Sequence, residues 1–219
     1  MSLNIIPNPK EKVGNQVFRY GFTENFKMID NKDWALAVPE EDVDQVPSYL
    51  LEIFARFYHL DYIWKYGNQC VKMSTILRRI LRLHGYEAHT RQVILTYDNK
   101  PRKWSCQVGS PQNFLGDNEL DVHMVVVCDG WLLDFSVMNI LWGHYGFQAP
   151  IAFIAKDPGS AGSNWFEGMQ DFGNYGKASW FPRIPANNFV KHWQVEQRDE
   201  VKQEVMEYFK IYKMERHDD

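Results

Sequence analysis

The feature that most constrains the fold of this 219-residue chain is a hairpin signature near its middle. Residues 122–128 form an apolar, β-branched run, and residues 131–135 form a second apolar run. The pair Asp129-Gly130 separates them, and Asp-Gly is a preferred two-residue connection between antiparallel strands because both positions accept positive φ. The sequence therefore predicts an antiparallel sheet at the centre of the molecule.

Three other segments show apolar residues at helical spacing. They cover about residues 48–58 after Pro47, a stretch from Asn68 to Gly85, and residues 199–214. Asn68 suits the N-cap of the second helix and Gly85 suits its C′ position. The apolar stripe of this helix consists of Met73, Ile76, Leu77, Ile80 and Leu81.

The remaining segments complete a mixed pattern. Strands are predicted at 88–97 and 103–108, and the acidic residues at 40–44 are predicted to be a solvated approach to the first helix. Residues 156–188 are rich in glycine and aromatics and are predicted to form a long ordered loop or lid. The pattern predicts an α+β fold with helices packed on an antiparallel sheet, in a single domain over residues 1–219.

The composition argues against several functional classes. The net charge of −4 predicts no nucleic-acid partner. No run of ~18 apolar residues occurs, and the amino-terminal residues lack a signal-peptide pattern, so no membrane association is expected. Three cysteines without a CxxC pair indicate reduced thiols and a cytoplasmic location. No ligand pair has zinc-like spacing, and no cofactor is expected.

Cys70 stands at the start of the second predicted helix. The first turn of a helix presents unpaired N–H groups and the positive end of the helix dipole, which favour a thiolate over a thiol. The backbone N–H of Cys70 can also donate to a developing oxyanion. Cys70 is therefore the candidate nucleophile, although a lone cysteine is more often a small buried side chain.

His123 opens the first strand of the hairpin and Asp134 closes the second, so the turn brings them side by side. An imidazole near a thiol acts as base or ion-pair partner, and a carboxylate orients the ring. Each residue alone has an ordinary structural explanation. The order and placement of Cys70, His123 and Asp134 together favour a catalytic triad.

The other cysteines and histidines are weaker candidates. Cys106 and Cys128 fall inside predicted strands and are expected to be core thiols. His84 and His89 lie near the end of the second helix and are expected at the surface or in a turn. His144, between glycines and aromatics, is the alternative to His123.

The residues around the candidate triad resemble a known superfamily. Residues 66–71 (Tyr-Gly-Asn-Gln-Cys-Val) resemble the transglutaminase motif in which Gly-Gln-Cys opens the central helix, and residues 83–93 resemble its following helix end and Arg-bearing strand. Residues 123–127 and 129–134 resemble the strands that carry the family's His and Asp. Over about 62–138 the chain thus resembles the transglutaminase-like superfamily, which includes the arylamine N-acetyltransferases and shares the papain-like plan.

The resemblance implies a papain-like core and an acyl-thioester on Cys70. The implied substrate is a protein, a peptide or a small amide, attacked at a glutamine carboxamide or peptide amide. Oxyanion or substrate contacts are expected from Trp64, Gln69 and Trp131. Residues 139–219, an aromatic and glycine-rich loop followed by a helix, match no such pattern and are expected to carry specificity.

Three alternatives remain open at this point. A cysteine peptidase or amidase would use the same three residues for hydrolysis. An acetyl-CoA-type acyltransferase is less favoured, because Asn68-Gln69 and 135–137 replace the glycines that such enzymes carry around the Cys and after the Asp. A binding module would keep the fold without the chemistry.

Overall fold

The computed structural model describes residues 4–5, 20–21, 36–66, 69–99, 104–109, 123–137, 152–159, 169–173, 176–182 and 197–212. The helices are the 3-10 helix η1 (Glu40–Gln45), α1 (Ser48–His59), α2 (Tyr62–Tyr66), α3 (Cys70–Leu83) and α6 (Arg198–Ile211). The strands are β1 (Asn4–Ile5), β2 (Tyr20–Gly21), β3 (Leu36–Ala37), β4 (Ala88–Asn99), β5 (Trp104–Val108), β6 (His123–Cys128), β7 (Trp131–Asp134), β8 (Ala152–Lys156), β9 (Gln170–Asp171) and β10 (Lys177–Pro182).

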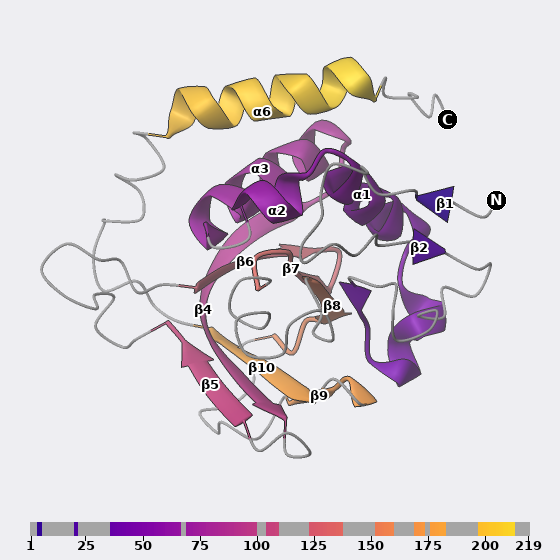
Figure 1. Cartoon of the computed structure of the whole chain (residues 1–219), viewed down its shortest axis with the longest axis vertical. Coiled ribbons are helices and arrows are strands. Elements are labelled where there is room, and N and C mark those ends of the chain that lie inside the picture. The colour runs from indigo at the N-terminus through magenta and orange to yellow at the C-terminus, as the bar shows by residue number, and fades with distance from the viewer. Residues whose placement is uncertain are drawn as a thin grey trace, which may run out of the picture.

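Within the described residues, eight strands form one curled sheet beneath the helices (Figure 1). The strand order is β3-β8-β7-β6-β4-β10-β9, and β5 pairs with the second half of β4. The pairs are antiparallel except for β3 with β8, which is parallel. The predicted α+β class is confirmed.

The sheet is buried on both faces, because successive side chains of a strand point to opposite sides. The helix-side core lies between the sheet and the helices, and its strand residues include Val126, Trp131, Leu133 and Ile154. The far-side core fills the other face of the curled sheet, and it includes Val93, Val125, Leu132, Phe153, Phe172 and Trp180.

The β6–β7 hairpin confirms the strongest local prediction. Asp129 and Gly130 both adopt positive φ, at 49° and 80°, which is the conformation that a two-residue primed turn requires. The turn pairs Cys128 with Trp131 and Val126 with Leu133. The register of the hairpin is therefore fixed by its turn.

Helix α3 begins at Cys70 after Gln69, and the predicted cap Asn68 lies outside the described residues. At the other end, Gly85 has a φ of 94°. The backbone N–H groups of Gly85 and Tyr86 donate to carbonyls of the last turn, at 3.1 Å each. This is a Schellman motif, so the predicted helix stop at Gly85 is confirmed.

The predicted lid at 156–188 is wrong in part. Residues Lys177–Pro182 form strand β10, which pairs with β4 so that Trp180 faces Leu95. Trp180 is only 2% exposed. The strand has little β-branched character, so pairing with β4 and burial on the far side determine its conformation rather than local preference. Much of the remaining segment lies outside the described residues.

Helix α6 crosses α2 and α3 on the outside of the molecule (Figure 1, yellow) and confirms the helix predicted at 199–214. The Oε1 atom of Glu204 accepts hydrogen bonds from Lys65 and Tyr66, at 2.5 Å each. The hydroxyl of Tyr62 donates to the backbone carbonyl of Glu204 at 2.6 Å. One α6 residue thus anchors this helix to the segment that leads into Cys70.

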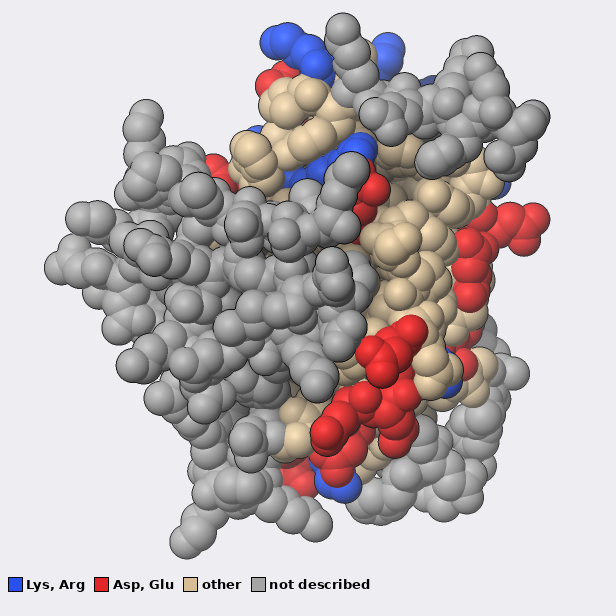
Figure 2. All heavy atoms as spheres, turned by 90° about the vertical axis from the view of Figure 1, so that its right-hand side faces the viewer, with Lys and Arg blue, Asp and Glu red and all other residues tan. Residues whose placement is uncertain are grey.

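The acidic stretch at 40–44 forms η1 and is only partly solvated. Glu40, Glu41 and Asp44 are exposed, and Figure 2 shows acidic side chains gathered on one face of the molecule. Asp42 instead is buried and pairs with Lys156 at 2.8 Å. The ion pair compensates the carboxylate for its loss of solvent.

In the part of the chain that the structure describes, no helix has the length and apolar character to cross a membrane.

Candidate functional site

His123 and Asp134 meet on the far-side face of the sheet. Continuing the β6–β7 register places Asp134 opposite Val125, two residues from His123, and positions two apart on a strand share a face. The Nε2 atom of His123 lies 2.5 Å from Oδ2 of Asp134. The two side chains are 1% and 0% exposed, so solvent does not compete for this contact.

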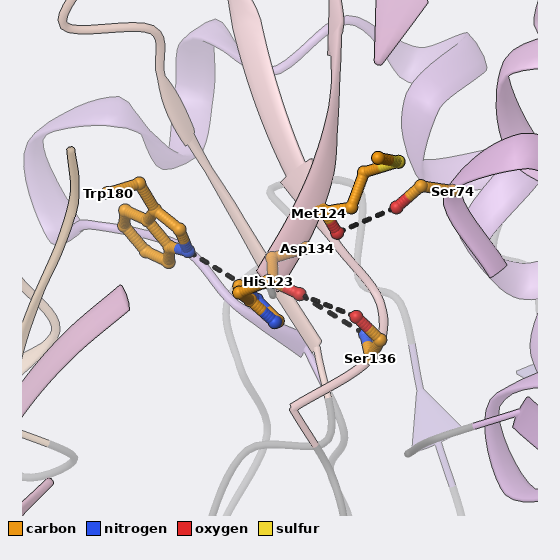
Figure 3. Close-up of polar contacts among 6 residues, drawn as sticks. All are labelled: Ser74, His123, Met124, Asp134, Ser136 and Trp180. Atoms are coloured by element: carbon orange, nitrogen blue, oxygen red, sulfur yellow. Dashed lines mark hydrogen bonds and ion pairs between the residues drawn. The ribbon is translucent and has the colours of Figure 1, made fainter. Parts of the chain in front are cut away.

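The Asp134 carboxylate is held by further donors (Figure 3). Oδ1 accepts from the backbone N–H and the hydroxyl of Ser136, at 3.2 Å each. Oδ2 also accepts from Nε1 of Trp180 at 2.8 Å. A buried carboxylate is costly unless it is paired and hydrogen-bonded, and here both oxygens are satisfied.

Cys70 completes the group from the other side of the ring. It is the first residue of α3, is half-buried, and hydrogen-bonds with the side chain of His123. Because Nε2 of His123 already serves Asp134, Nδ1 is the ring nitrogen left for the thiol. The hydroxyl of Ser74, one turn along α3, donates to the carbonyl of Met124 at 2.7 Å and fixes the helix against β6 (Figure 3).

The electrostatics of the group favour a charged imidazole. Burial alone lowers the pKa of His123, because it disfavours the protonated ring. The charge and hydrogen bond of Asp134, together with the contact to Cys70, outweigh burial and raise the pKa of His123 to about 10. A protonated imidazole is the form that can stabilise a neighbouring thiolate.

The three residues expected to contact the substrate lie in different surroundings. Gln69 precedes α3, its side chain is exposed, and its carbonyl accepts from the backbone N–H of Met73 at 2.9 Å. Trp131 is buried in the helix-side core, and its odd spacing from Asp134 puts it on the opposite face of β7. The structure does not bring Trp131 to the group. The side chain of Trp64 lies outside the described residues.

The other cysteines behave as predicted where the structure describes them. Cys128 is buried in the helix-side core, and its Sγ lies 3.6 Å from the hydroxyl of Tyr49. Burial raises the pKa of Cys128 to about 11, so it stays a thiol at neutral pH. The side chain of Cys106 lies outside the described residues.

The histidines agree with the prediction where the structure describes them. His84 lies in the turn that ends α3, as expected. It is also half-buried, with Nε2 3.3 Å from the hydroxyl of Tyr208 and its ring against Phe209, because α6 covers the end of α3. His89 is exposed, as expected. His144 lies outside the described residues. Among the described residues, no His, Cys, Asp or Glu cluster could hold a metal ion.

Sequence reasoning missed two residues of the group, Ser136 and Trp180. Ser136 follows Asp134 by two positions, the spacing at which a serine can donate to a preceding aspartate, so local sequence contained a usable signal. Trp180 lies in a segment that resembled a loop, and no local pattern links it to Asp134.

Comparisons with known proteins do not assign a family. No family model matches the chain, and no curated protein matches it. A crystal structure from a structural-genomics project matches with a TM-score of 0.45 and 15% identity, covering 67% of this chain and 68% of that one. A likeness of this strength carries no argument about function.

Proposed function

We propose that the protein is a thiol-nucleophile enzyme that transfers or hydrolyses an acyl group through a thioester on Cys70. We further propose that α3 and the sheet follow the papain-like, transglutaminase-like plan. One observation carries the proposal: the His123 ring contacts both the Cys70 thiol and the Asp134 carboxylate. A thiol, an imidazole and an orienting acid in this sequence of contacts form the arrangement that activates a cysteine nucleophile.

The proposed reaction has two halves. The Cys70 thiolate attacks the carbonyl carbon of an amide, a C–S bond forms, and the backbone N–H of Cys70 donates to the oxyanion. The C–N bond then breaks and the His123 imidazolium gives its proton to the departing amine. In the second half, His123 takes a proton from water or an amine, which attacks the thioester and releases Cys70.

The proposed substrate is a glutamine carboxamide or a peptide amide. The buried His123–Asp134 pair supports this choice, because it holds the imidazole in a fixed orientation from which it can pass a proton to a departing amine. The acceptor decides between transfer and hydrolysis: an amine gives a transferase, and water gives an amidase or peptidase.

The pH dependence of cysteine alkylation by iodoacetamide, followed by peptide mass spectrometry, tests the proposal. We expect Cys70 to react at pH 6 almost as fast as at pH 8, because the imidazolium maintains the thiolate. His123→Ala should slow Cys70 at pH 6 by about tenfold or more. Cys128, buried and with a raised pKa, serves as the internal control.

Either outcome is informative. If Cys70 follows the pH dependence of an ordinary thiol in both proteins, the chain is a binding module on this fold and the enzyme proposal fails. If the activated thiol is found, a glutamine-containing peptide identifies the acceptor. Ammonia is released in both reactions, but the peptide product is glutamate after hydrolysis and carries the added amine after transfer. Stable acetylation of Cys70 by acetyl-CoA would instead indicate acyl-CoA chemistry.

A further inference from the structure

Trp180 reaches Asp134 from a distant part of the sheet. In the order β7-β6-β4-β10, three strand spacings separate Asp134 on β7 from Trp180 on β10. In a flat sheet the axes of β7 and β10 would therefore lie roughly 14 Å apart. Nε1 of Trp180 nevertheless lies 2.8 Å from Oδ2 of Asp134. The curl of the sheet closes this gap, because the far-side face is concave and its side chains converge (Figures 1 and 3).

The indole N–H of Trp180 donates to the same carboxylate oxygen of Asp134 that contacts the imidazole of His123. Oδ2 of Asp134 lies 2.5 Å from Nε2 of His123 and 2.8 Å from Nε1 of Trp180, while Ser136 binds Oδ1. All three side chains that meet at Oδ2 are nearly inaccessible to solvent. An indole N–H is a donor only and does not titrate in the physiological range, so this contact persists when the charge of His123 changes.

The ring of Trp180 is itself held in place. It packs edge to face against Phe153 and Phe172, with ring centroids 5.6 and 6.1 Å away. The rotation of the indole is thereby restricted, and its N–H keeps a fixed direction. A rigid donor of this kind can fix the orientation of a carboxylate more firmly than solvent could.

We propose that Trp180 is a positioning residue of the candidate site. Its N–H, together with Ser136, holds the Asp134 carboxylate so that Oδ2 faces Nε2 of His123, and the ring in turn keeps Nδ1 toward Cys70. This inference rests on the proposed function, because positioning matters only if the imidazole activates the thiol. It adds to the group a side chain supplied by the carboxyl-terminal part of the chain.

Trp180→Phe tests the inference, because phenylalanine keeps an aromatic ring in the cluster while it removes the donor; the volume that it also removes is what the control variant addresses. We expect the alkylation rate of Cys70 at pH 6 to fall about threefold to tenfold, with the pH profile moving toward that of an ordinary thiol. Phe172→Leu is the matched control: it loosens the same aromatic cluster but removes no hydrogen bond to Asp134. It should lower the melting temperature and leave the pH profile unchanged.

A double-mutant cycle separates positioning from packing. In a His123→Ala background, Trp180→Phe should cause no further loss of Cys70 reactivity, because the ring that it positions is gone. An equal loss in both backgrounds would mean that the indole acts by packing, and would overturn the inference. If His123→Ala itself has no effect, the proposed function fails; if only Trp180→Phe has no effect, the inference fails alone.

A second readout needs no change at Trp180, in case Trp180→Phe does not fold. In the wild-type protein, the Nε1–H proton of Trp180 can be identified in the NMR spectrum through its contacts with Phe153 and Phe172. Asp134→Asn should shift this resonance and speed its exchange with solvent, because a neutral acceptor is weaker than a carboxylate. An unchanged resonance would show that the indole does not bond to the carboxylate, and would overturn the inference.

Discussion

At the scale of single residues, Gly109 packs closely against the backbone at the start of β6, where His123 lies. Gly109 has a φ of +90°, and a Cβ added there would lie 2.9 Å from the carbonyl oxygen of Val93 and 3.3 Å from the backbone nitrogen of His123. Gly109→Ala should therefore cost about 1–3 kcal/mol of unfolding free energy. It should also slow the alkylation of Cys70, because relief of the clash displaces the first residue of β6.

Gly85 provides the control for this prediction. Its φ is +94°, but nothing lies within 4 Å of an added Cβ. Gly85→Ala should destabilise the protein by a similar backbone strain of about 1 kcal/mol without changing the reactivity of Cys70. Urea unfolding and alkylation rates of both variants check the pair. Equal alkylation rates in the two variants would contradict the account of Gly109.

The sequence was sufficient to select Cys70, His123 and Asp134, and the structure brings these three together. Each occupies the end of an element whose boundary is set by local chemistry: a helix start for Cys70, and the two arms of an Asp-Gly hairpin for the others. Trp180 could not be selected, because its link to Asp134 depends on the curl of the whole sheet. Trp131 lies on the opposite face of β7 from Asp134, and its aromatic character gave no information about which face of the strand it would occupy.

At the scale of elements, α6 depends on Glu204. Its side chain accepts from Tyr66, which is buried, and from Lys65, which is about half exposed. Burial tends to raise the pKa of Glu204, but these donors outweigh it and lower the pKa. Glu204→Ala should cost about 1–3 kcal/mol, mostly because the Tyr66 hydroxyl loses its acceptor.

Glu207 is the matched control on the same helix. Its pair with Lys210 spans 3.9 Å and both side chains are largely exposed, so Glu207→Ala should change the unfolding free energy by no more than about 0.5 kcal/mol. Urea unfolding of the two variants measures the difference. If both substitutions lower the unfolding free energy by the same amount, Glu204 does not anchor α6.

The elements differ in how well sequence specifies them. The hairpin and the end of α3 were predictable because a turn or a cap requires particular residues at particular positions. Strand β10 was not, since Lys177–Pro182 lacks the β-branched alternation of a strand. The partner strand β4 supplies its conformation, and that partner lies far away in the sequence.

At the scale of the whole molecule, the His123–Asp134 pair predicts how stability depends on pH. The ordinary pKa of histidine is about 6.5, and in the folded protein Asp134 and Cys70 raise that of His123 to about 10 despite burial. Between these values the folded state holds a proton that the unfolded state lacks, so stability falls as pH rises. The contribution of the protonated His123 to folding stability is complete below about pH 6.5 and is lost as the pH rises through about 10.

Chemical denaturation across pH 6–10 measures this effect. Other groups also titrate near pH 10, so the relevant quantity is the difference between the wild-type protein and His123→Gln. We expect this difference to favour the wild-type protein most at pH 6 and to shrink toward pH 10. A difference that is constant across the range would contradict a protonated His123 in the folded state.

The donation from Trp180 to Asp134 has a consequence for synthesis of the protein. A growing chain contains Cys70, His123 and Asp134 before it contains residue 180, so the indole is the last of the four side chains to leave the ribosome. Strand β10 must then pair with β4 before the Asp134 carboxylate can accept the hydrogen bond from Trp180. The last donor to Asp134 is therefore available only after most of the chain has been made.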